Sequence, residues 1–127
     1  MCVPLIIISV RHTYTMNCLD WAWVAGIFEG EASFTISGGY PRISLQMTDE
    51  DIVRRVADYF DVNVGFRKSK NPKHKDLYQI HIIKREVLIE CYLELYKHLG
   101  SRRRQALQKF HYFWTHRRGL SLPDLSI

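Results

Sequence analysis

Two glutamates, Glu29 and Glu31, lie where an apolar, helix-like segment gives way to residues 33–37, which alternate polar and apolar types. Side chains two positions apart in a helix point to different sides, so each glutamate needs its own explanation. Carboxylate oxygens suit Mg²⁺ and similar hard cations, which clamp phosphate oxygens during in-line hydrolysis. The alternative is that both glutamates are solvated charges at a helix end.

The helix that carries these glutamates is expected to touch another helix closely. Ala22, Gly26 and Gly30 recur every four residues and therefore stack on one face. A glycine inside a helix costs about 1 kcal/mol relative to alanine, so two glycines on one face favour a close helix contact. The flanks are also apolar, which predicts burial all round, and a central helix of a small domain is the alternative. The apolar run is about half of the roughly 20 residues that a membrane span requires.

Residues 24–34 resemble the LAGLIDADG motif of homing endonucleases. They read Val-Ala-Gly-Ile-Phe-Glu-Gly-Glu-Ala-Ser-Phe, with Val24 for the leading leucine, glutamate for both aspartates and Ala32 for the closing glycine. The resemblance assigns binding of the catalytic metal, Mg²⁺ or Mn²⁺, to Glu31 and to the Gly30 carbonyl. It implies a structural role for Glu29, which would cap the partner helix.

The resemblance also implies site residues outside the motif. A basic residue near the scissile phosphates would stabilise developing charge, with Arg102 as the first choice and Lys97 as the second. Gln46 or Asp49 stands where the family often keeps a polar residue that orders active-site water. The two basic candidates belong to a basic cluster between the last two expected helices: Lys97, Arg102, Arg103 and Arg104. For most of this cluster the alternative is a solvated helix end, where cations are favoured.

The length and composition predict one compact domain that acts as a homodimer. The chain has 127 residues, of which 46% are hydrophobic, and it contains one copy of the motif. The simplest partner for the glycine-faced helix is therefore the same helix of a second subunit across a two-fold axis. The predicted interface comprises Ala22, Gly26, Glu29 and Gly30, within about residues 20–30. The net charge of +5 favours a polyanionic partner.

The cysteines predict a reducing environment. Cys2, Cys18 and Cys91 are odd in number and lack Cys-x-x-Cys spacing, which argues against a disulfide framework or a structural zinc site. We therefore expect an intracellular location, in the cytoplasm of a microbe or in an organelle, with no membrane partner.

Residues 1–16 are expected to be an N-terminal extension, residues 17–116 the domain, and residues 117–127 a C-terminal tail.

The remaining patterns predict an α+β domain with a four-stranded antiparallel sheet. A hairpin turn at 37–40 joins the first strand to a second at 41–47, and Thr48 with Asp51 suggests a capping box for a helix to Phe60. A second hairpin joins strands 64–70 and 77–83 around residues 71–75. Helices at 85–99 and 101–116 follow, separated by Gly100. This αββαββα(α) order is that of the LAGLIDADG-type fold, in which the sheet forms a DNA-binding saddle.

Polar residues on the expected non-core side of these strands predict contacts with double-stranded DNA. Such side chains can read base edges in a major groove, while an ordinary solvated sheet face is the alternative. The strand residues are Thr35, Ser37, Arg42, Ser44, Gln46, Lys68, Lys70, Gln79 and His81. Phosphate contacts are expected from Arg67, Lys73 and Lys75 in or near the second hairpin.

The leading hypothesis from the sequence is a site-specific homing endonuclease. The resemblance implies a metal-dependent double-strand break in a long, roughly palindromic DNA target, and an intron or intein as the host element. The alternative is a catalytically inactive protein of the same fold that acts as a maturase on intron RNA or as a DNA-binding regulator. A monomeric enzyme for a small substrate has no support, because neither a nucleotide-binding glycine loop nor a nucleophile triad occurs.

Overall fold

A computed structural model describes residues 16–126 of the chain. The helices are α1 (Cys18–Glu31), α2 (Glu50–Phe60), α3 (Arg85–Leu95) and α4 (Ser101–Tyr112). The strands are β1 (Ala32–Ser37), β2 (Tyr40–Met47), β3 (Gly65–Arg67) and β4 (Leu77–Ile82). A 3₁₀ turn, η1 (Tyr96–His98), follows α3, and a π-helical turn, η2 (Phe113–Arg117), extends α4. The predicted α+β fold is confirmed.

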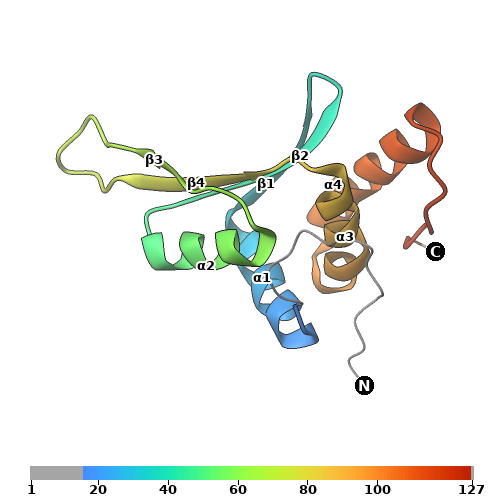
Figure 1. Cartoon of the computed structure of the whole chain (residues 1–127), viewed down its shortest axis with the longest axis horizontal. Coiled ribbons are helices and arrows are strands. Elements are labelled where there is room, and N and C mark those ends of the chain that lie inside the picture. The colour runs from blue at the N-terminus through green and yellow to red at the C-terminus, as the bar shows by residue number, and fades with distance from the viewer. Residues whose placement is uncertain (1–15, 127) are drawn as a thin grey trace.

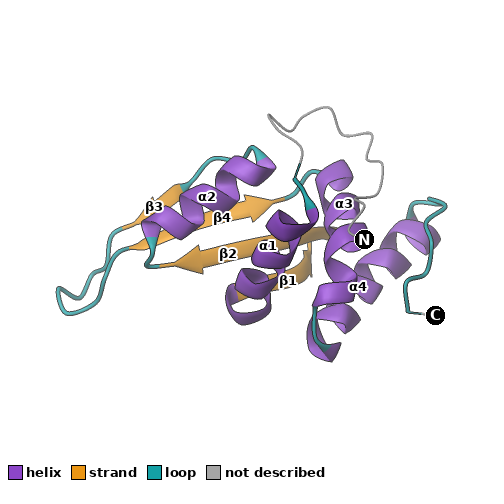
Figure 2. Ribbon diagram, turned by 90° about the horizontal axis from the view of Figure 1, so that it is seen from below, coloured by secondary structure: helices purple, strands orange, loops and turns teal. Residues whose placement is uncertain are grey.

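The strands form one antiparallel sheet in the order β1-β2-β4-β3. All the helices lie on one side of this sheet, and its other side is left uncovered (Figures 1 and 2). Gly38 and Gly39 both have positive φ in the β1–β2 turn, a conformation that glycine adopts without steric cost. The sheet therefore has one face that packs on the core and one face that none of the described helices covers.

The core lies between the helices and the covered face of the sheet. Phe28 of α1 stacks on Phe60 of α2, with ring centroids 6.0 Å apart, and meets Phe34 of β1 edge to face at 6.3 Å. Phe110 of α4 packs against Phe34 of β1, with ring centroids 6.4 Å apart. Burying each such aromatic ring contributes about 1.5–3 kcal/mol, so these contacts tie α1, α2 and α4 to the sheet.

The ends of several elements differ from the sequence predictions. The proposed capping box at Thr48 is wrong: Asp49 occupies the N-cap of α2, and its side chain makes no capping hydrogen bond. Acidic residues in the first turn of α2 stabilise that helix end instead. A capping box does form at α1, where Asn17 and Asp20 each accept a hydrogen bond from the other's backbone N–H.

Residues beyond η2 return to pack on α3. The Tyr92 hydroxyl donates to the Pro123 carbonyl and accepts from the Leu125 N–H, each at 2.9 Å. Cys18 is disulfide-bonded, a pairing that the spacing of the cysteines did not indicate, while Cys91 is a buried free thiol. The predicted N-terminal extension lies outside the described residues except for Met16. Within the described part, no helix has the length and apolarity of a membrane span.

Candidate nucleic-acid interface and metal site

The end of α1 brings Glu31 to the surface beside the sheet. Glu31 is the last residue of α1 and is exposed, while the next residue, Ala32, is buried and begins β1. Among the described residues, Glu31 has no hydrogen-bond or ion-pair partner. Its carboxylate is therefore available to an external ligand.

The two carboxylates stand at the electrostatically unfavourable end of α1. The carboxyl end of a helix carries partial negative charge, and the last turn of α1 contains no basic residue. Arg103 of α4 supplies the missing cation: its Nη2 and Nε donate to the Glu29 carbonyl at 3.3 and 3.4 Å. Its Nε also lies 3.7 Å from the Glu29 carboxylate. Arg103 thus compensates Glu29, whereas Glu31 keeps an unpaired charge.

Glu29 caps a helix of its own chain. Its Oε1 accepts a hydrogen bond from the backbone N–H of Gly100, the N-cap residue of α4. A Cβ at position 100 would lie 3.0 Å from that oxygen, so any larger residue there would push the Glu29 carboxylate away by a few tenths of an ångström. The contact gives Glu29 a structural role within one chain, and its predicted place in a dimer interface stays a prediction.

The donor set at this helix end suits a hard divalent cation. The Glu31 carboxylate and the carbonyl of exposed Gly30 both offer oxygen, the ligand atom that Mg²⁺ prefers. No group of three or more His, Cys, Asp or Glu side chains in residues 16–126 could enclose a metal ion. Mg²⁺ usually keeps water and substrate phosphate ligands around one or two protein carboxylates, so the residues present fit that mode of binding.

The small-residue face of α1 is open to solvent. Ala22, Gly26 and Gly30 are exposed, and a Cβ added at either glycine would meet nothing within 4 Å. Leu19, one turn earlier, is 80% exposed. The prediction that α1 is buried all round is therefore wrong within one chain, because the core takes the opposite side of the helix.

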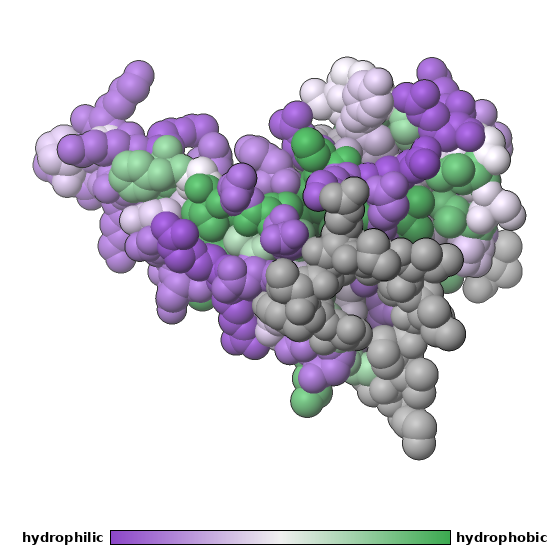
Figure 3. Space-filling view, in the orientation of Figure 1, coloured by the Kyte–Doolittle hydropathy of each residue, from purple (hydrophilic) through white to green (hydrophobic). Residues whose placement is uncertain are grey.

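The uncovered side of the sheet, called the open face below, is polar. Strand register brings together Thr35 with Arg42, Ser44 with His81, and Gln46 with Gln79. Figure 3 shows the upper outline of the molecule hollowed over the sheet, with hydrophilic residues gathered at its β3–β4 end. The members of the open face are Ser33, Thr35, Ser37, Tyr40, Arg42, Ser44, Gln46, Gly65, Arg67, Leu77, Gln79 and His81.

Most of the predicted strand residues lie on this face, with two exceptions. Lys68 and Lys70 fall in the β3–β4 loop, because β3 ends at Arg67. The side chain of Asp76 accepts the Ser69 N–H at 2.8 Å, so that N–H is not available to continue the ladder. The sequence interpretation missed Ser33, the register partner of Ser44, although the alternation along β1 indicated it.

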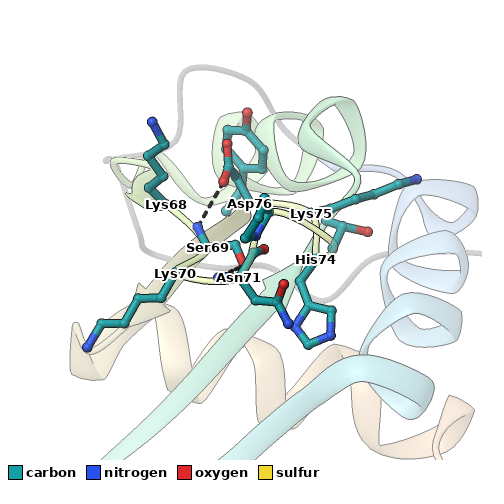
Figure 4. Close-up of a pocket in the computed structure, with 10 residues that line it drawn as sticks. Lys68, Ser69, Lys70, Asn71, His74, Lys75 and Asp76 are labelled. Atoms are coloured by element: carbon teal, nitrogen blue, oxygen red, sulfur yellow. Dashed lines mark hydrogen bonds between the residues drawn. The ribbon is translucent and has the colours of Figure 1, made fainter.

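The β3–β4 loop, residues 68–76, surrounds a basic hollow of about 670 Å³. Hydrogen bonds within the loop hold its shape: the Asn71 side chain accepts from the Lys73 N–H, and the Asn71 carbonyl accepts from the His74 N–H. Figure 4 shows Lys68, Lys70 and Lys75 extending outward in different directions from this hollow. Lysines spread in this way suit contacts with several phosphates.

The other predicted site residues lie at the start of α4, in η1, at the start of α2 or on the sheet. Arg102 is exposed in the first turn of α4, beside the end of α1, and Lys97 is exposed in η1. Gln46 lies on the open face and Asp49 at the start of α2. Arg104 instead holds the backbone, donating to the carbonyls of Tyr96 and Lys97 at 2.9 Å each.

The fold and the site together define a class of protein. A glycine-faced helix that ends in a free carboxylate leads into an antiparallel sheet whose open face is polar and basic. Residues 19–95 match the model of the LAGLIDADG-like domain, which spans more than half of the chain. The chain belongs to the LAGLIDADG family.

Comparison with solved structures gives the same fold for one homing endonuclease. The archaeal intron-encoded homing endonuclease I-Vdi141I, complexed with DNA, superposes with a TM-score of 0.60 at 16% identity, covering 80% of this chain and 70% of that one. Two complexes of the homing endonuclease I-CvuI with DNA, one with Mg and one with Ca, give TM-scores of 0.48 and 0.49 at 18% identity. They cover 75% and 76% of this chain and 66% of each of theirs. No curated protein matches the chain.

Proposed function

We propose that this chain is a homodimeric, divalent-metal-dependent endonuclease that cuts double-stranded DNA at a long, roughly palindromic site. The observation that carries the proposal is the free carboxylate of Glu31 at the α1–β1 junction, beside a sheet whose strand residues on the open face include no acid. A protein of the same fold, I-Vdi141I, has been solved complexed with DNA.

The open face would bind the duplex. Its arginine, glutamine and histidine side chains offer hydrogen bonds to base edges, and the lysines of the β3–β4 loop attract phosphates without reading sequence. None of the helices covers this face, so a duplex can approach without rearrangement of the fold (Figure 2). The residues on the face would therefore set the target sequence.

The reaction centre would lie at the end of α1. Glu31 and the Gly30 carbonyl would hold Mg²⁺ or Mn²⁺, which when bound activates a water molecule and stabilises the leaving oxygen of a phosphodiester. Arg102 would stabilise negative charge on the phosphate, and Gln46 or Asp49 would orient water. Arg103 and Glu29 would keep the end of α1 fixed against α4.

The exposed face of α1 would form the dimer contact. Ala22, Gly26 and Gly30 allow two helix backbones to approach closely, and the cost of two helical glycines has no compensation inside one chain. A two-fold axis along this face would bring one Glu31 from each subunit near its centre. Two such sites would account for cutting both strands.

A cleavage assay tests the proposal. Purified protein is incubated with Mg²⁺ and a plasmid that carries the native locus with its intervening element removed. We expect a double-strand break at one defined position. Specific binding with no break in Mg²⁺ or Mn²⁺ would contradict an endonuclease and favour the regulator; binding of intron RNA in place of DNA would favour the maturase.

A further inference from the structure

One cross-strand hydrogen bond joins two side chains on the open face. Ser44 Oγ of β2 lies 2.8 Å from Nδ1 of His81, its register partner on β4. Both strands are interior strands of the sheet, so the pair lies near the middle of the face. No other register pair on the open face has a side-chain hydrogen bond between its members among the described residues.

The bond fixes the orientation of an exposed imidazole. A histidine side chain turns about two torsions, and anchoring Nδ1 to the neighbouring strand restricts both. Nε2 is then the only ring nitrogen available to a ligand, and it has no partner among residues 16–126. His81 is exposed, so a ligand on the open face can reach it.

The direction of the Ser44–His81 hydrogen bond decides whether Nε2 donates or accepts. In the neutral ring one nitrogen donates and the other accepts, so a Ser44 hydroxyl that donates to Nδ1 leaves the hydrogen on Nε2. In the protonated ring both nitrogens donate and Ser44 accepts. Nε2 carries a hydrogen in both of these states, whereas a neutral ring with its hydrogen on Nδ1 would donate to Ser44 and leave Nε2 as an acceptor.

We propose that Ser44 and His81 form a base-reading unit, in which the Ser44 hydroxyl donates to Nδ1 and sets the ring, and the His81 Nε2–H donates to guanine in the major groove. This inference rests on the proposed function, because it requires DNA on the open face. Guanine presents two acceptors, N7 and O6, whereas adenine pairs its acceptor with a donor, thymine pairs its O4 acceptor with a methyl group, and cytosine presents a donor. A fixed donor therefore favours guanine, at one position in each half-site.

Selection from a randomised double-stranded DNA library, with magnesium left out, tests the unit. The wild type should select several defined positions, including a guanine preferred about tenfold in each half-site. His81→Ala should remove that preference and leave the other positions unchanged. Ser44→Ala should weaken the same preference, and Ser44→Ala should have no further effect in the His81→Ala background. A purely structural role for the bond would not move one base preference alone.

His98→Ala is the matched control, since His98 is an exposed histidine on η1, away from the strands. It should leave every preference unchanged, and circular dichroism melts should show that all variants fold. Loss of a base other than guanine, or no change in His81→Ala, would overturn the base-reading unit while leaving the proposed function intact. A wild type that selects no sequence would contradict the proposed function and this inference with it.

Discussion

Arg103 and Glu29 join the start of α4 to the end of α1. The guanidinium donates to the Glu29 carbonyl, with Nη2 at 3.3 Å, and lies 3.7 Å from its carboxylate through Nε. The Arg103 side chain is only 14% exposed, and its guanidinium carbon lies 5.6 Å from the centre of the Phe34 ring. One arginine therefore neutralises one motif glutamate and fixes the helix end that carries the other.

Removing the Glu29 side chain should destabilise the domain. Glu29→Ala removes the carboxylate that the Gly100 N–H and the Arg103 guanidinium contact. We expect the free energy of unfolding to fall by about 1–2 kcal/mol, limited by solvent exposure of the carboxylate. Urea unfolding measures the change. Glu31→Ala is the matched control and should cost less than about 0.5 kcal/mol. Equal losses in the two variants would show that the Glu29 contacts contribute nothing.

A bulky residue at position 26 should block dimerisation and leave the monomer folded. No atom lies within 4 Å of a Cβ at Gly26, so Gly26→Leu fits within one chain and also raises helix propensity. Sedimentation should show a dimer for the wild type and a monomer for Gly26→Leu. Gln105→Leu, on the exposed surface of α4, should remain dimeric. A wild type that sediments as a monomer at all concentrations would refute the interface.

The lysines of the β3–β4 loop should contribute salt-dependent, sequence-independent affinity. Lys70→Ala and Lys75→Ala should each reduce the slope of log affinity against log salt by about 1, without changing base preferences. Fluorescence anisotropy with target and unrelated duplexes measures both effects. Lys109→Ala, an exposed lysine on α4, should leave the slope unchanged. A change in base preference for Lys70→Ala would show that this lysine reads sequence.

Cys91 should resist thiol reagents in the folded protein. Burial raises its pKa well above the usual 9.0, with Glu90 adding to the shift, so the reactive thiolate is suppressed. Its contribution to stability is complete below pH 9.0 and decreases as the pH rises toward the raised pKa of the folded state. Iodoacetamide labelling with peptide mapping should modify Cys91 only in denaturant. Labelling at the same rate in native protein would contradict its burial.

Local patterns in the sequence predicted most of the fold. The helix at residues 18–31, the first hairpin and the polar alternation along β2 and β4 depend on neighbouring residues, and each is present. The end of β3 depends on a hydrogen bond between Ser69 and Asp76, seven residues apart, and periodicity could not locate it. For the same reason periodicity predicts Lys68 and Lys70 on a strand, whereas β3 ends at Arg67.

Local patterns in the sequence could not predict contacts between residues that lie far apart in the chain. Glu29 and Gly100 are 71 residues apart, and nothing local to either residue indicates the other. Among Arg102, Arg103 and Arg104, the one that faces α1 is set by where α4 begins and how it packs. The Ser44–His81 bond required the strand register, although both residues were predicted to face the partner.

The most direct test compares DNA binding and DNA cutting by Glu31→Gln. This substitution keeps the size of the side chain and removes the charge that would hold the metal ion. With the target duplex and Mg²⁺, we predict unchanged binding and a loss of cleavage of about a hundredfold or more. Glu86→Gln, an exposed glutamate in the first turn of α3, is the control and should cut at the wild-type rate. Full cleavage by Glu31→Gln would contradict the proposed mechanism.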